Sequence, residues 1–357
     1  MHPKNAGSER LRLSPFDALP EDGPPRRDQR DLMERPFFSL AKGRRTAPIL
    51  YRAGCIEVQV HAVPEHGMAT IWDADVLIWA GSQIVAAAER GVTTSRFLRF
   101  TPYHLLTAIG RGAGQHQYLL LKAALARLQS TAVRTTIRNG AQWRRQQFSW
   151  INEWEERVTA SGRCEGMEFI LPDWFHRGVL DQQLVLTIDP AYFRLTGGIE
   201  RWLYRVARKH AGHQPRGWAF EFRHLHAKSG SLARFTDFAL DLRRIAARQP
   251  LPRYRLAVQR TAAGAEVLHI SPGQLCGQTV DNIRAPVDQH GRSGAEGIGT
   301  SGAGLSADQA QECPANHCHD NEIRPLNESN RESNSKLVVG RPPGGKADRD
   351  GEREGAP

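Results

Sequence analysis

The aromatic residues of this chain stop abruptly about three-quarters of the way along it. Every Phe, Trp and Tyr lies before position 272, and the remaining residues are rich in Gly, Pro, Ser and Asn. Because a folded core needs large apolar side chains, residues 272–357 are expected to form a disordered tail. The preceding part is long enough for two modest cores, so the sequence favours two folded domains.

The positive charge lies in the part of the chain that can fold. Residues 1–271 carry 39 Lys and Arg against 25 Asp and Glu, a net charge of +14, whereas the tail carries 9 against 13. Such an excess favours an anionic partner, usually nucleic acid or a membrane surface. The simpler alternative is that the charge only keeps the protein in solution.

The sequence has no feature of export or membrane insertion. Its first residues, MHPKNAGSER, lack the apolar segment of a signal peptide, and no run reaches the roughly 18 apolar residues of a membrane span. The five cysteines are odd in number and scattered, which argues against a disulfide framework. A cytoplasmic protein with reduced thiols and no membrane contact is therefore expected.

Residues 1–35 lack periodicity and are expected to be a disordered arm, and residues 36–165 are expected to form the first domain. Alternation over residues 56–61 predicts a strand. Apolar residues at helical spacing then predict a helix between the N-cap Asp73 and Gly91.

Two shorter helical patterns follow in the same domain. Thr101-Pro102 opens a short second helix, and a glycine-rich turn separates it from a third helix with an apolar stripe at Tyr118, Leu121, Leu125 and Leu128. Asn139-Gly140 then predicts a β-hairpin whose strands run from Val133 to Trp150.

Residues 166–271 repeat this order and are expected to form the second domain. Helical patterns begin near Ile199 and His224, and a third has apolar positions at Leu232, Phe235, Phe238, Leu242 and Ile245. A hairpin from Tyr254 to Ile270 with Gly264 in its turn completes the repeat.

Helix, helix, turn, helix and hairpin is the order of a winged helix-turn-helix domain, in which the third helix enters the major groove of DNA. The predicted fold class is α+β, with two such domains in tandem. DNA contacts are then expected on the third helix and hairpin of each domain. In the first domain they are Gln115, Gln117, Lys122, Arg127, Arg134, Arg138, Arg144 and Arg145. In the second domain they are Lys228, Ser229, Ser231, Arg234, Asp237, Arg244 and Arg248.

The alternative is that these residues form ordinary solvated faces. The hypothesis of a DNA-binding surface requires that Lys122 and Arg244 belong to a shared basic surface, and it fails if both are tucked away from one.

Metal-dependent chemistry has two short candidate motifs. His224-Leu225-His226 matches the His-hydrophobe-His pattern of rolling-circle nicking enzymes, but its place in a predicted helix disfavours a shared metal. The group Cys313, His317, Cys318 and His319 lacks the separated ligand pairs of a structural zinc site. We therefore expect no catalytic residues, no metal and no cofactor.

Several blocks of this sequence resemble the replication initiator protein A family of broad-range plasmids. The resemblance extends from about Pro36 to Ser271 and does not include the tail. Its clearest blocks are TPYHLL from Thr101, KAALARLQST from Lys122, GMEF from Gly166, LPDWF from Leu171, LTIDPAYFRL from Leu186, FRHLHAKSGS from Phe222 and RYRL from Arg253.

The resemblance implies a non-enzymatic initiator that binds origin repeats in double-stranded DNA, opens the adjacent duplex and recruits the host replicative helicase and initiator. It also implies repression of its own gene as a homodimer. Two rival functions remain, a winged-helix transcriptional repressor that uses the same surface and the metal-dependent DNA nickase.

Overall fold

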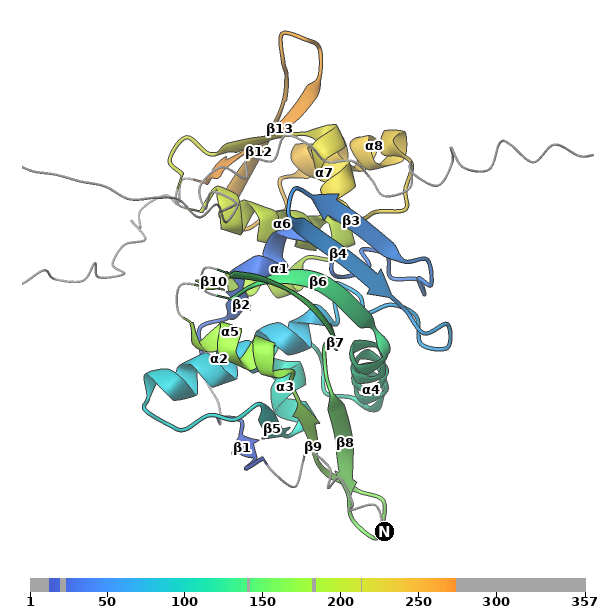
Figure 1. The fold of residues 1–357 in the computed structure, drawn as a ribbon, viewed down its shortest axis with the longest axis vertical. Helices are drawn as coiled ribbons and strands as arrows, with labels where there is room; N and C mark the ends of the chain where they lie inside the picture. Colours follow the sequence, from blue (N-terminus) through green and yellow to red (C-terminus); the bar gives the residue numbers. More distant parts are fainter. Residues whose placement is uncertain (1–12, 20–23, 140–141, 182–183, 213, 274–357) are drawn as a thin grey trace, which may run out of the picture.

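Two units with the same chain connectivity form the folded part of the protein. The computed structural model describes residues 13–19, 24–139, 142–181, 184–212 and 214–273, without the side chains of residues 137–144. The tail expected from residue 272 lies outside the described residues from 274 onward. In Figure 1 the second unit, in yellow and orange, lies above the first.

The first unit is built on the three predicted helices and on a sheet that includes the strand between the first two of them. Its elements are α2 (Ala74–Glu89), β5 (Phe97–Phe100), α3 (Pro102–Ala108), α4 (Gln115–Ser130), β8 (Glu153–Val158) and β9 (Cys164–Ile170). Strand β9 pairs antiparallel with both β5 and β8, and the short β1 (Phe16–Asp17) lies parallel to β5. The three predicted helices are therefore confirmed.

The second unit repeats this connectivity. Its elements are α6 (Gly198–His210), β11 (Trp218–Glu221), α7 (Phe222–Ser229), α8 (Phe235–Arg248), β12 (Tyr254–Arg260) and β13 (Glu266–Pro272). The sheet order is β11-β13-β12, so the last strand again lies between the other two. The predicted apolar stripe of the third helix is wrong at one position, because Leu232 precedes α8 and is 66% exposed.

An additional hairpin separates the third helix of the first unit from its sheet. It consists of β6 (Ala132–Asn139) and β7 (Gln142–Ser149), and the turn residues between them lie outside the described residues. Strand β6 pairs with β4 (Ile56–His61), which pairs with β3 (Ile49–Ala53). The sequence correctly predicted this hairpin, but the hairpin equivalent to β12–β13 is β8–β9, which it missed.

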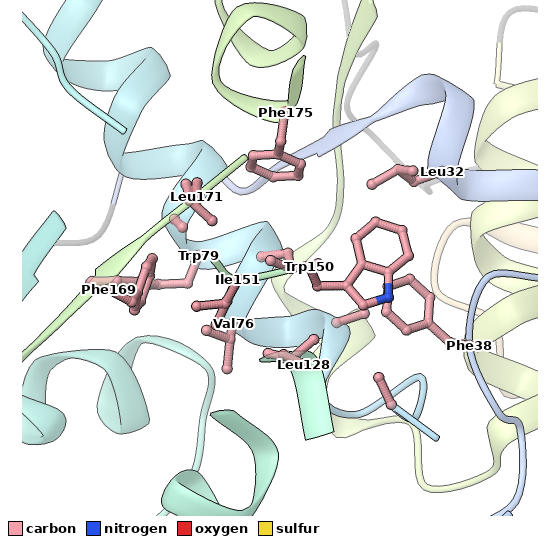
Figure 2. Close-up of a cluster of buried hydrophobic side chains, with 14 of the residues drawn as sticks. Leu32, Phe38, Val76, Trp79, Leu128, Trp150, Ile151, Phe169, Leu171 and Phe175 are labelled. Atoms are coloured by element: carbon pink, nitrogen blue, oxygen red, sulfur yellow. The ribbon is translucent and has the colours of Figure 1, made fainter. Parts of the chain in front are cut away.

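The core of the first unit extends beyond the boundary expected at residue 166. Trp150 lies near its centre, stacked on Phe38 with ring centroids 4.7 Å apart (Figure 2). Phe169 and Phe175 pack in the same cluster, and Phe175 belongs to α5 (Asp173–Leu180), which packs on α2. Strand β9 and α5 therefore belong to the first unit, which ends near residue 181 instead of residue 165.

The expected disordered arm, residues 1–35, is partly ordered. Residues 1–12 and 20–23 lie outside the described residues, but β2 (Arg27–Gln29) pairs antiparallel with β10 (Val185–Thr187). The following α1 (Arg30–Glu34) packs on α6. A 3₁₀ turn at Pro190–Arg194 then leads from β10 to the second unit. Local sequence could not reveal this order, because it comes from contacts with residues about 160 positions away.

Three groups of buried or largely buried ion pairs connect α6 and α7 of the second unit to α2, β2 and α1, and we call them the interface ion pairs. Asp75 on α2 accepts hydrogen bonds from Arg201 on α6 at 2.7 Å and from Arg111 at 2.9 Å. Asp28 accepts from Nε of Arg205 at 2.7 Å.

The third group is centred on Glu34 of α1. Its carboxylate pairs with Lys209, with His210 at 2.7 Å and with Lys228 at 2.9 Å. Buried charges are stabilising only when they are paired, so the interface ion pairs favour one arrangement of the units.

Candidate nucleic-acid interface

Helix α4 is held by one apolar side and leaves the opposite side in solvent. Leu121, Leu125 and Leu128 are fully buried, as their spacing predicted. The preceding helix α3 is capped by Thr101, whose Oγ1 accepts a hydrogen bond from the backbone N–H of His104 at 3.4 Å. The predicted contact residue Gln115 is exposed at the first turn of α4, and Gln117 is half-buried.

The two cationic residues predicted to contact DNA from α4 are ion-paired within the protein. Lys122 lies 2.8 Å from the carboxylate of Glu156 on β8. Arg127 donates two hydrogen bonds of 2.8 Å to Asp73, the residue before α2, and these bonds raise the pKa of its guanidinium. The sequence interpretation missed both partners, because each is distant along the chain.

The predicted arginines of the additional hairpin are only partly described. Arg134 on β6 and Arg145 on β7 are exposed. The side chains of Arg138 and Arg144 lie outside the described residues. This hairpin therefore presents at least two cations to solvent, next to the strand β4 with which it pairs.

Lys228 and Ser229, at the end of α7, were predicted to bind phosphate but are buried. The side chain of Lys228 is 3% exposed and pairs with Glu34, and Ser229 is 1% exposed. Ser229 donates from Oγ to the carbonyl oxygen of His226 and accepts from the N–H of Ser231. In this conformation Lys228 and Ser229 stabilise the fold and the junction of the units, and they cannot reach a ligand. Ser231 is half-buried in the same turn.

Helix α8 presents charged residues along its solvent side. Arg244 is 65% exposed and lies 3.6 Å from the carboxylate of Asp241, one turn earlier in the helix. Arg234 pairs with Asp237 at 2.9 Å, and Arg248 pairs with Glu200 of α6 at 2.7 Å. The hypothesis requires Lys122 and Arg244 to belong to a shared basic surface. Arg244 is exposed enough to contribute to one, whereas Lys122 is only 35% exposed and is paired with Glu156.

The tips of β8–β9 and β12–β13 have the same turn, which the sequence analysis overlooked. In both tips, the backbone N–H of a Thr donates to the carbonyl oxygen of the residue four positions later, at 2.9 Å. The Oγ1 of the same Thr accepts a hydrogen bond from the N–H of that residue. This bond is 3.0 Å long between Arg163 and Thr159, and 3.1 Å long between Ala265 and Thr261. Gly162 and Gly264 both have a left-handed φ, of 78° and 81°. The repeated pattern Thr-Ala-x-Gly in the sequence was the signal that could have revealed it.

Arginines lie beside both turns. Arg157 and Arg163 are exposed near the first tip, and Arg260 is exposed directly before the second. Figure 1 shows the two hairpins projecting from opposite ends of the molecule, with α4 and α8 on the same side of the view. The arrangement offers two helices and two basic tips to a long partner.

The two histidines of the His-hydrophobe-His motif do not share a site. Both belong to α7, where positions two apart point in nearly opposite directions. The ring of His224 stacks on Phe220, and Nε2 of His226 lies 2.8 Å from the carbonyl oxygen of Ala233. The described part of the chain contains no group of three or more candidate metal ligands, although the crowded Cys313–His319 segment lies outside it.

Among the described residues, no helix combines the length and apolar character that a bilayer span requires.

Comparison with known proteins finds a similar sequence and similar solved structures. A "Putative replication protein" of Wigglesworthia glossinidia brevipalpis is 29% identical over 228 residues, which are 63% of this chain and 82% of that protein. Two crystal structures of domains 2 and 3 of RctB match with TM-scores of 0.48 and 0.45, at 11% and 10% identity. Both matches cover 66% of this chain. The first covers 95% of its RctB chain and the second covers 94%.

A family model matches more than half of the chain. The model of replication initiator protein A matches residues 27–256, which include the first unit from β2 onward, the segment that joins the units and the second unit as far as the start of β12. The chain therefore belongs to the replication initiator protein A family.

Proposed function

We propose that this protein initiates replication of a plasmid by binding double-stranded origin DNA with two winged helix-turn-helix units. The observation that carries the proposal is the repeated connectivity of helix, strand, helix, helix and hairpin, with the last strand between the other two. In winged helices that connectivity presents the third helix to the major groove and the hairpin to the neighbouring backbone. Helices α4 and α8 are then the recognition helices.

The wing of the first unit is β8–β9 and not β6–β7. Strand β9 pairs with β5, which lies between the first two helices, as β13 pairs with β11 in the second unit. The shared turn supports the same assignment. Arg163 and Arg260 are then expected to contact phosphates, while the β6–β7 hairpin adds Arg134 and Arg145 beside α4.

The family and the basic charge support the remaining parts of the proposal. The net charge of +14 over residues 1–271 suits a duplex partner, because each neutralised phosphate releases counterions. We propose that origin binding opens the adjacent duplex and brings in the host helicase and initiator, without catalysis by this chain. Binding to its own operator as a homodimer belongs to the same proposal.

A binding experiment tests the DNA interface. The full chain is titrated onto labelled origin DNA from its own replicon at 50 and 200 mM salt, with a scrambled fragment as control. An interface with six or more phosphate contacts loses about a thousandfold in affinity over this range. Binding that ignores salt, or that does not prefer the origin fragment, contradicts the proposal.

A replication experiment separates initiation from repression alone. The gene is deleted from the replicon and supplied again from a second, compatible plasmid. An initiator is required in trans for maintenance of the deleted replicon, whereas a repressor that binds the same DNA is dispensable. Maintenance without the gene would reject the initiator function.

A further inference from the structure

The solvent side of α4 carries two exposed leucines. Leu119 is 56% exposed and Leu120 is 41% exposed. The small residue Ala123 is exposed one turn further on, and Gln115 is exposed one turn before. Residues three and four apart on a helix lie on one face, so these four side chains form one surface, which we call the α4 reading face.

The cations of α4 do not belong to this face. Lys122 is bound to Glu156 and Arg127 to Asp73, so each neutralises a carboxylate of a neighbouring element. Helix α4 contains no Asp or Glu, and its Lys and Arg side chains are both paired. Phosphates are therefore not repelled, and the arginines beside the helix, on β6, β7 and the β8–β9 tip, have complementary charge.

The chemistry of the major groove provides a partner for this combination. The 5-methyl group of thymine is the apolar group that base edges present there, and Gln makes paired hydrogen bonds to adenine, the partner of thymine. A small side chain such as that of Ala123 allows the helix to approach the base edges closely. Exposed leucines and a glutamine on one helical face therefore suit A·T pairs.

We infer that the α4 reading face recognises thymine methyl groups through Leu119 and Leu120. This inference rests on the proposed function of the protein. Helix α8 differs, because it carries long cations with largely exposed side chains, Arg244 at 65% and Arg248 at 62%, and such cations suit guanine or phosphate. The two units then read half-sites of different chemistry, an A·T-rich one under α4 and another under α8.

Thymine-to-uracil substitution in the DNA tests the inference without changing the protein. Uracil lacks the 5-methyl group but keeps the hydrogen-bonding edges of thymine. Each thymine of the bound origin site is replaced in turn, and the affinity of the full chain is measured. The expected result is a loss of about threefold to fivefold at each methyl group that the leucines bury, at positions within one groove.

A double variant assigns these positions to α4. Leu119→Ala with Leu120→Ala is expected to bind thymine and uracil equally at those positions, while Arg244→Ala keeps the preference for thymine. Leu180→Ala, another exposed leucine on α5, is the matched control and should behave as the unchanged protein. Thermal unfolding of the double variant checks that it folds, which is expected because both side chains are in solvent.

Each outcome decides between the alternatives. If the unchanged protein binds origin DNA but ignores every methyl group, the inference fails and the proposed function stands. If it does not bind duplex DNA at all, both fail. If the double variant keeps its DNA affinity and its preference for thymine but loses plasmid maintenance, the α4 reading face binds a protein, and the inference is again wrong.

Discussion

At the scale of single residues, the basic side chains divide into those that hold the protein together and those that face solvent. Lys228 and Arg244 were both predicted to contact DNA, yet one is buried against Glu34 and the other is largely exposed. Sequence patterns could not separate them, because the partners of Lys228 and Arg127 lie on elements far along the chain.

This division predicts opposite effects of two alanine substitutions. Lys228→Ala removes one of three partners of the largely buried Glu34 and should lower the free energy of unfolding by about 2 kcal/mol. Arg244→Ala should change it by less than about 0.5 kcal/mol and weaken DNA binding instead. Urea unfolding and DNA titration measure both quantities, and equal loss of stability in the two variants would contradict the division.

The ionisation of Glu34 predicts a stability that depends on pH. Burial alone would raise its pKa, but the hydrogen bond with His210 and the charges of Lys209 and Lys228 hold the pKa well below its ordinary value. A lowered pKa in the folded state stabilises the protein above the unfolded pKa of about 4.3. That contribution is lost as the pH falls through the folded value.

Urea unfolding between pH 7 and pH 3 measures this contribution. Stability should fall below about pH 4.3 in the unchanged protein. It should fall less steeply in Glu34→Gln, and the exposed Glu65→Gln should behave as the unchanged protein. The same acid dependence in all three proteins would mean that Glu34 is not the group responsible.

At the scale of elements, the two hairpin tips are the features that most clearly repeat. If both tips contact phosphates, Arg163→Ala and Arg260→Ala should each reduce the slope of log affinity against log salt by about 0.9. Arg177→Ala, an exposed arginine on α5, is the matched control and should leave the slope unchanged. Unchanged slopes in both tip variants would show that the hairpin tips do not contact phosphates.

Local patterns predicted most helices and two of the hairpins, because capping residues, glycines and apolar periodicity act over a few positions. The Thr101 cap and the pairing of β6 with β7 on either side of the predicted turn are examples. The same patterns missed the β8–β9 hairpin, where the repeated Thr-Ala-x-Gly pattern was the one local signal. Its place in the sheet depends on the pairing of β5 with β9, which joins residues about 70 positions apart. They also placed β9 and α5 in the wrong unit, although both pack in the first core.

At the scale of the whole molecule, the interface ion pairs favour one relative position of the two units, and so of α4 and α8, the proposed recognition helices. Asp75→Asn removes the negative charge that pairs with Arg201, whose side chain is 3% exposed. It should lower the free energy of unfolding by about 3 kcal/mol. Asp241→Asn changes a partly exposed carboxylate on α8 and is the control, with an effect below about 0.5 kcal/mol. Equal effects would show that the junction does not depend on buried charge.

A fixed junction also limits the DNA that both units can bind together. Insertion of 5 base pairs, about half a helical turn, between the half-sites moves one of them to the opposite side of the duplex. The unchanged protein should then bind with one unit only, at an affinity near that for an isolated half-site. Full affinity for the lengthened site would mean that the units rotate freely about their junction.

Hydroxyl-radical footprinting of the full chain on the origin DNA of its own replicon tests the central claim most directly. Two winged helices should protect two stretches on one side of the duplex, with centres about 10 base pairs apart. Arg244→Ala should weaken one stretch and the Leu119→Ala, Leu120→Ala variant the other. A single protected stretch, or one that both variants weaken equally, would contradict recognition by two separate units.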